Sequence, residues 1–269
     1  MITSDIVEMF DLPLKDYYIC YFDVLGYKAF FENNPNEHKK FLVEMLVVIA
    51  DIKSEILKKQ DITEICFRSY SDNFLIFIEK NLISEYDALR LLCKMIRNIQ
   101  IRLLMNCYVL VRGSITVGEF FVNEQIVFGQ GLIKAVFLED KVAINPRIII
   151  DKDCFDNSII EQLATENVLI KDSDGNFFVN YLSSVGKLKL TKGKCEALID
   201  KHCKYHPLIK EQNEILQIEK IISKYLWLLV YFNQQCDNLN NPEFKIKYIL
   251  KINEQLLKTE IICDRKTNN

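Results

Sequence analysis

The sequence predicts an α+β fold with a mostly antiparallel sheet. Short runs rich in aromatic and β-branched residues are typical of buried strands. Longer segments with apolar residues three or four positions apart are typical of amphipathic helices. These segments follow one another in the order β-α-β-β-α-β-β-α-β. That order favours helices packed on one face of a sheet, with one crossover at the start of the chain.

Five elements alternate between residues 17 and 105. They are predicted as strands at 17–23, 62–70 and 74–79, and helices at 38–59 and 84–105. Gly26 interrupts the chain soon after the first strand. The segment Ser71-Asp72-Asn73 joins the next two strands, and its composition is favoured in tight turns.

The second half continues the same alternation before it becomes helical. The predicted elements are strands at 107–117, 147–150 and 177–181, a hairpin turn at 172–175, and a helix from Gly129 to about Lys141. Beyond residue 184 the sequence is lysine-rich, with one amphipathic face between Ile215 and Leu229. We therefore predict an α+β domain at 1–183 and a C-terminal helical extension at 184–269 that packs on it.

The composition narrows the class of protein. The chain has 269 residues, a net charge of −3 and a pI near 5.8, which is unlike the basic balance of most nucleic-acid-binding proteins. Nine scattered cysteines and an acidic start without an apolar segment predict a cytoplasmic protein with reduced thiols. The longest apolar runs are shorter than the roughly 20 residues of a membrane-spanning helix.

Two aspartates occupy positions suited to a divalent cation. Asp23 ends the first apolar run, and Asp72 lies in the turn between the next two strands. A strand end and a hairpin tip can bring two carboxylates together, where they repel each other unless a cation lies between them. Mg²⁺ is bound in this way, by one or two carboxylates together with phosphate oxygens.

Four segments in order resemble the class III nucleotidyl cyclases. They are Phe22-Asp23-Val24-Leu25-Gly26-Tyr27, Ser71-Asp72-Asn73-Phe74-Leu75, residues 112–119 and residues 129–139. The resemblance covers residues 17–150 and implies a ferredoxin-like core with a mostly antiparallel sheet and helices. Further segments up to residue 233, including Lys224-Tyr225-Leu226-Trp227, are similar to the bacterial pyrimidine cyclases of Pycsar anti-phage systems.

The resemblance implies a site and a reaction. Asp23 and Asp72 would be catalytic and, with the Val24 carbonyl, would bind two Mg²⁺ or Mn²⁺ ions. The backbone of Val24, Leu25, Gly26 and Tyr27 would hold the triphosphate, and Lys28 would add positive charge. The product would be 3′,5′-cyclic CMP or UMP, a second messenger for a separate effector. A head-to-tail homodimer with shared active sites is expected, without nucleic acid or direct membrane binding.

Arg68 is the candidate for base recognition. In purine-specific relatives, a lysine four residues before the second metal position recognises adenine, and Arg68 stands there. An arginine fork matches the adjacent acceptors O2 and N3 of cytosine better than the acceptor–donor–acceptor edge of uracil. Guanine also offers two acceptors. We therefore favour CTP over UTP.

The chain departs from the family on the helix after Gly129. The asparagine and arginine of adenylyl cyclases fall at Ile133 and Phe137, which cannot hydrogen-bond to a phosphate. Arg112, Lys134 and Arg147 are the candidates to supply positive charge instead.

Other interpretations remain open at this stage. The departure on the helix favours a weak or inactive cyclase-like module that binds a nucleotide without converting it. The chain could also be a structural partner that keeps the sheet only as a dimer scaffold. Zinc binding by Cys195, His202, Cys203 and His206 is disfavoured, because the spacing lacks the usual paired cysteines.

Overall fold

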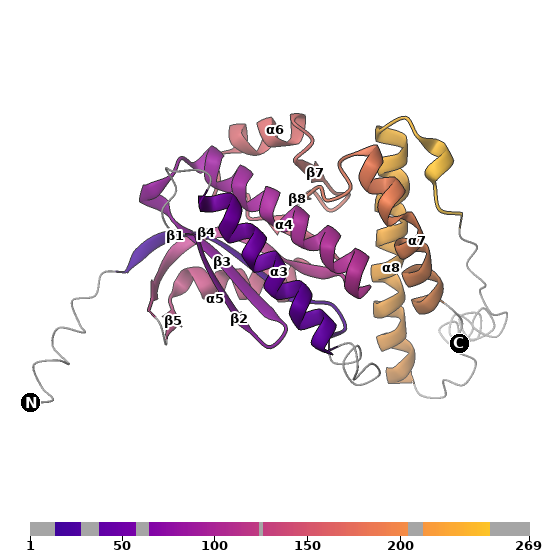
Figure 1. The fold of residues 1–269 in the computed structure, drawn as a ribbon, viewed down its shortest axis with the longest axis horizontal. Helices are drawn as coiled ribbons and strands as arrows, with labels where there is room; N and C mark the ends of the chain where they lie inside the picture. The colour runs from indigo at the N-terminus through magenta and orange to yellow at the C-terminus, as the bar shows by residue number, and fades with distance from the viewer. Residues whose placement is uncertain (1–13, 28–37, 58–64, 124–125, 204–211, 248–269) are drawn as a thin grey trace, which may run out of the picture. The chain divides into compact units, whose positions relative to one another are not determined.

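The computed structural model describes residues 14–27, 38–57, 65–123, 126–203 and 212–247 (Figure 1). The strands are β1 (Lys15–Val24), β2 (Ile65–Tyr70), β3 (Asn73–Glu79), β4 (Val111–Val122), β5 (Val127–Phe128), β6 (Ile148–Ile150), β7 (Leu169–Lys171) and β8 (Phe177–Val179). The α-helices are α3 (His38–Leu57), α4 (Glu85–Cys107), α5 (Gln130–Lys141), α6 (Asn157–Thr165), α7 (Val185–His202) and α8 (Gln212–Asn238). Two short 3₁₀ helices are η2 (Lys80–Leu82) and η3 (Pro242–Phe244).

The sheet confirms the predicted fold class. Its strands run in the order β2-β3-β1-β4-β6-β8-β7, and β5 pairs with β4. All pairings are antiparallel except that of β4 with β6. Since β1 and β2 both run antiparallel to β3, α3 forms the predicted crossover at the start. A second crossover, through α5, joins β4 to β6.

Helices cover both faces of the sheet, so the prediction of helices on one face was wrong. The even-numbered residues of β1, such as Tyr18 and Phe22, pack with α3 and α4 in the main core. The odd-numbered residues Tyr17 and Ile19 pack with Ala135 of α5 on the opposite face. Figure 1 shows α3 and α4 on one side of the strands and α5 on the other. Successive side chains of a strand point to opposite faces, so one apolar run serves both cores.

Two glycines let α5 lie directly on the sheet. A Cβ atom on Gly118 of β4 would lie 2.5 Å from the Cα of Gly131 in α5. A Cβ atom on Gly131 would lie 2.6 Å from Cδ1 of Ile19. Further along, the Ser114 hydroxyl donates a hydrogen bond to the Ala135 carbonyl, 3.0 Å away. These contacts fix the height and direction of α5, and its last turn therefore lies over the end of β1.

Local geometry explains where the elements differ from the prediction. Helix α4 continues to Cys107, and Tyr108 then takes a left-handed conformation (φ 56°) that ends it. As a result β4 begins at Val111 rather than at residue 107. Helix α6 was not predicted. It begins where the Asp156 side chain accepts a 2.7 Å hydrogen bond from the Ser158 N–H group.

The chain forms two compact units, Met1–Lys187 and Leu188–Asn269. The boundary lies inside α7, a few residues after the predicted division at 183/184. In the second unit, Asn233 of α8 exchanges two hydrogen bonds with the backbone of Ile246, at 2.8 and 3.0 Å. Among the described residues, no helix has the length and apolar character required to cross a bilayer.

Candidate active site

The register of the first four strands brings polar residues together at one end of the sheet. Asp23 of β1 lies opposite Asn73 of β3 and opposite Arg112 of β4, and Tyr70 of β2 lies opposite Asn73. These four residues form one row, and residues aligned across neighbouring strands share a face. The face is that of α5. Asp23 therefore points away from the main core, toward the face on which α5 packs.

The β2–β3 turn places Asp72 beside this row. The Val24 N–H group donates a 3.2 Å hydrogen bond to the Asp72 carbonyl, which ties the turn to the end of β1. The Asn73 amide donates to the Asp72 carboxylate at 3.3 Å and accepts from the Tyr21 hydroxyl at 2.7 Å. The structure thus brings together the two aspartates that the sequence singled out.

Arg112 neutralises part of the negative charge. Its Nε donates to both carboxylate oxygens of Asp23, at 3.1 and 3.3 Å, and its Nη2 donates to Oδ2 at 3.2 Å. The same Nη2 lies 2.7 Å from Oε1 of Glu139, in the last turn of α5. Arg112 was predicted to touch phosphate, and here it joins two carboxylates.

The sequence prediction missed Glu139. It is buried, as are Gly131 and Ala135 on the same side of α5 at intervals of four residues. Residues four apart lie on one helix face, and this face packs on the sheet. The sequence did contain a signal for it: a glutamate that continues a stripe of small residues at intervals of four indicates a carboxylate on the packed face of the helix.

Burial and mutual repulsion shift the titration of these groups. Burial raises the pKa of Glu139 to about 7, helped by the charge of Asp23 and opposed by Arg112. Burial also raises the pKa of Asp23, although hydrogen bonds from Arg112 oppose the rise. Burial and the charges of Glu139, Asp23 and Asp72 raise the pKa of Tyr21 to about 12. The negative charges of three carboxylates therefore act on the Tyr21 hydroxyl, partly offset by Arg112, and favour a cation nearby.

The loop after β1 is only partly available to a phosphate. The N–H groups of Val24 and Leu25 already donate to the carbonyls of Asp72 and Leu110, at 3.2 and 2.8 Å. Gly26 has φ 72°, a left-handed conformation that favours glycine, and open space around its Cβ position. Lys28 lies outside the described residues. Backbone donation to a phosphate would therefore begin at Gly26 and Tyr27.

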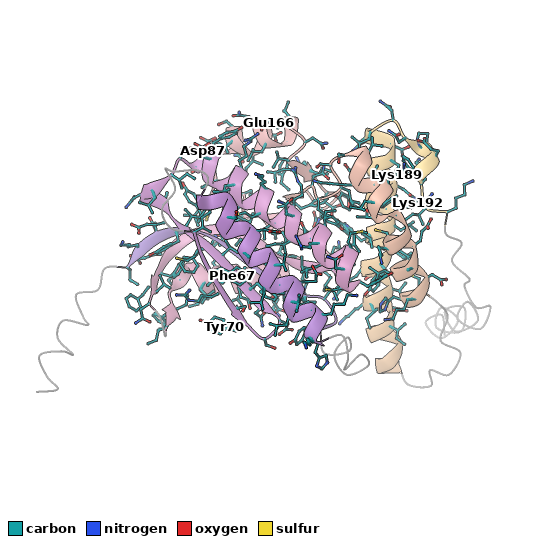
Figure 2. All side chains as sticks on the ribbon, in the orientation of Figure 1. Phe67, Tyr70, Asp87, Glu166, Lys189 and Lys192 are labelled. Atoms are coloured by element: carbon teal, nitrogen blue, oxygen red, sulfur yellow. The ribbon has the colours of Figure 1, made fainter. Side chains whose placement is uncertain are left out.

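Arg68 lies on the same face, one row further along the sheet. It is opposite Leu75, which is opposite Tyr21, and its Nη1 donates to the Phe67 carbonyl at 3.1 Å. Figure 2 labels its neighbours on β2: Phe67 packs toward the main core, and Tyr70 is exposed. Base recognition by Arg68 stays a prediction, with the side chain on the appropriate face.

Lys134 and Arg147 have other partners. Lys134 lies 2.7 Å from the buried Asp151 carboxylate, which also accepts a hydrogen bond from Thr116. Arg147 is buried and forms ion pairs with Asp172 and Asp174 of the β7–β8 turn. None of these described contacts joins Lys134 or Arg147 to Asp23 or Asp72. Their role in nucleotide binding stays a prediction without support from these contacts.

Ile133 and Phe137, which the sequence resemblance aligned with an asparagine and an arginine of adenylyl cyclases, are each 57% exposed. They face neither the Asp23 row nor the core beneath α5.

The donor set fits a magnesium ion bound by two protein carboxylates, with phosphate oxygens or water completing its coordination. Among the described residues, no three His, Cys, Asp or Glu side chains form a cluster that could hold a metal ion. Asp23 and Asp72 are two carboxylates at one site, and Mg²⁺ commonly takes one or two of these plus phosphate oxygens and water. His206 of the alternative zinc site lies outside the described residues.

The raised pKa of Glu139 predicts a pH-dependent stability. The unfolded side chain loses its proton near pH 4.5, whereas the folded one does so near 7. Protonated Glu139 is thus favoured in the folded state, and its stabilisation is lost as pH rises through 7. We expect Glu139→Gln to gain on the order of 2 kcal/mol over wild type between pH 5 and 8. Urea unfolding in EDTA measures this, with exposed Glu119→Gln as control. An identical pH dependence in Glu139→Gln and wild type would contradict it.

Comparison with known proteins gives structural neighbours only. No protein-family model and no curated protein matches the sequence. The adenylyl cyclase CyaB from P. aeruginosa is 14% identical with a TM-score of 0.43, over 62% of this chain and 94% of that one. The monomeric guanylyl cyclase domain of the RhoGC fusion protein from Blastocladiella emersonii is 12% identical with a TM-score of 0.42, over 62% of this chain and 95% of that one. A dimeric form of that domain is 12% identical with a TM-score of 0.41, over 61% of this chain and 96% of that one.

Proposed function

We propose that this protein is a metal-dependent nucleotidyl cyclase that converts CTP, or else UTP, to the 3′,5′-cyclic monophosphate and pyrophosphate. In this reaction the 3′-hydroxyl oxygen bonds to the α-phosphorus, pyrophosphate leaves with the bridging oxygen, and the hydroxyl proton is released. The observation that carries the proposal is the meeting of Asp23 and Asp72. They come from a strand end and a hairpin turn that are 49 residues apart and are joined by the Val24 to Asp72 hydrogen bond.

The residues around the aspartates suit phosphoryl transfer. Asp23 and Asp72 would hold Mg²⁺ or Mn²⁺, which when bound lowers the hydroxyl pKa and neutralises the triphosphate. Gly26 lets the backbone approach a phosphate closely. The last turn of α5 points the negative end of the helix dipole toward the site, which also favours a cation. Tyr21 and Asn73 hold the hairpin turn in place through their hydrogen bond.

Arg68→Lys tests the choice of base. Lysine keeps the charge and loses the planar fork, so we expect the preference for CTP over the other nucleotides to fall by roughly 10-fold. Triphosphate binding should fall less. Cyclic product formed from each of the four nucleoside triphosphates measures this, with Arg90→Lys on the exposed side of α4 as control. An equal loss of product from all four nucleoside triphosphates would mean that Arg68 contacts the phosphates or only shapes the pocket, and does not recognise the base.

Exposed apolar side chains on α5 and β5 support the proposed homodimer. Phe128 is 67% exposed, Ile133 and Phe137 are each 57% exposed, and Val136 is 38% exposed. Ile133, Val136 and Phe137 are three or four residues apart on α5 and so are neighbours on its surface, and contiguous exposed apolar side chains can mark an interaction surface. A second copy of the chain would cover it, and shared active sites would then bring a charged group to replace the missing asparagine and arginine.

The deciding experiment offers each nucleoside triphosphate with Mn²⁺ and separates the products by chromatography and mass spectrometry. A cyclic pyrimidine monophosphate supports the cyclase. Nucleotide binding without product supports the alternative of a cyclase-like binding module, which the positions of Ile133 and Phe137 favour. If the protein neither binds a nucleotide nor forms a product, the remaining hypothesis is a structural partner that keeps the sheet as a dimer scaffold. We further propose that the cyclic product acts as a second messenger on a separate effector in a bacterial cytoplasm.

A further inference from the structure

One guanidinium lies between the half-buried carboxylate of Asp23 and the buried carboxylate of Glu139. All three hydrogen bonds from Arg112 to a carboxylate go to Asp23, and they use both of its oxygens. The side chains of Arg112, Asp23 and Glu139 are 19%, 16% and 7% exposed. Asp23 therefore offers its oxygens to Arg112 and to a divalent cation in competition.

Glu139 has an oxygen that is ion-paired with Arg112 but not well hydrogen-bonded. Its Oε1 is buried and lies 2.7 Å from Arg112 Nη2, yet it accepts no hydrogen bond of acceptable geometry from the residues that the structure describes. Buried carboxylate oxygens are nearly always hydrogen-bonded, because the desolvated charge is costly. The oxygen is thus placed to receive a hydrogen bond that forms in another state of the site.

We infer that Glu139 is a positioning residue that takes Arg112 when a divalent cation binds Asp23. This inference rests on the metal site of the proposed function. In the arrangement described, Arg112 serves as the cation of Asp23. When a metal ion is bound, Arg112 turns to Glu139, and the oxygens of Asp23 become ligands.

The packing of α5 lets Arg112 move while Glu139 stays. The helix is held against β4 by the close approach of Gly118 and Gly131 and by the hydrogen bond from Ser114 to the Ala135 carbonyl. Arg112 has a long side chain on the strand below. Because Nη2 is already within hydrogen-bonding distance of Oε1, a rotation of the guanidinium is enough.

Two other roles for Glu139 make different predictions. It could be a third ligand of the metal, or it could attract the metal through its charge alone. In both cases it would act whether or not Arg112 is present. A positioning residue acts through Arg112, so its effect should disappear when Arg112 is replaced.

The test is a double-mutant cycle read by Mn²⁺ affinity, without nucleotide and at pH 8. Free Mn²⁺ is measured by electron paramagnetic resonance for wild type, Glu139→Gln, Arg112→Gln and the double variant. We expect Glu139→Gln alone to weaken Mn²⁺ binding by about 10-fold, as is common for residues that orient a metal ligand. In the Arg112→Gln background the same change should alter affinity by less than about 2-fold. Arg112→Met repeats the comparison if Arg112→Gln does not fold.

The controls separate this inference from the metal site itself. Asp72→Asn should lose Mn²⁺ binding, and Glu119→Gln on the exposed part of β4 should keep it. Equal weakening by Glu139→Gln with and without Arg112 would overturn the positioning role, as would no weakening at all. Wild-type protein that binds no Mn²⁺, or Asp72→Asn that binds it normally, would overturn the metal site and with it this inference.

Discussion

The Asp72→Ala variant should form no detectable cyclic nucleotide while it keeps its fold. The carboxylate supplies half of the protein's charge for the metal ion, and removing such a group commonly costs about three orders of magnitude or more in rate. The turn should survive, because Val24 donates to the backbone carbonyl of residue 72 and not to its side chain. Cyclic CMP and cyclic UMP formed with Mn²⁺ are the measurement.

A control in the same sheet makes this result specific. Asp16 lies on β1 at the opposite end from Asp23 and is exposed, so Asp16→Ala should keep wild-type activity and stability. Asp72→Ala should unfold in urea within about 1 kcal/mol of wild type, since its side chain makes one long hydrogen bond. Normal product formation by Asp72→Ala would remove the basis for the metal assignment.

Arg147→Met should lower the free energy of unfolding by about 3 kcal/mol. The Arg147 side chain is 1% exposed and forms ion pairs with Asp172 and Asp174. Removing one partner of a buried pair leaves uncompensated charge, at a typical cost of about 3–5 kcal/mol. The lower end applies because Asp174 is 44% exposed. Urea unfolding of the full chain measures the loss.

The matched control is Arg90→Met on α4. Arg90 is 57% exposed and lies 3.4 Å from Glu166 at the surface, so its loss should cost less than about 1 kcal/mol. If Arg147→Met instead unfolds like wild type and loses nucleotide binding, Arg147 contacts phosphate as the sequence predicted. The experiment thus decides between a structural and a substrate-binding arginine.

Local sequence was sufficient for the strands, the main helices and the two aspartates. Asp23 and Asp72 mark a strand end and a tight turn, and both positions follow from residues within a few places in the chain. Helix α6 was not predicted because it is only nine residues long. The placement of helices on both faces of the sheet was not predicted either. Strands that are buried on both sides show no alternation of polar and apolar residues that would distinguish the faces.

The sequence by itself determined that this chain forms an α+β fold with one carboxylate at a strand end and another in a hairpin turn. Tertiary structure alone decided which charged groups meet. The pairing of Asp23 with Arg112 spans 89 residues and depends on strand register, and Glu139 joins them only because two glycines let α5 lie against β4. Lys134 pairs with Asp151, and Arg147 pairs with Asp172. These pairs, too, form between residues that only the folded chain brings together. Coulomb interactions act over a few ångströms in space, and distance along the chain does not reveal them.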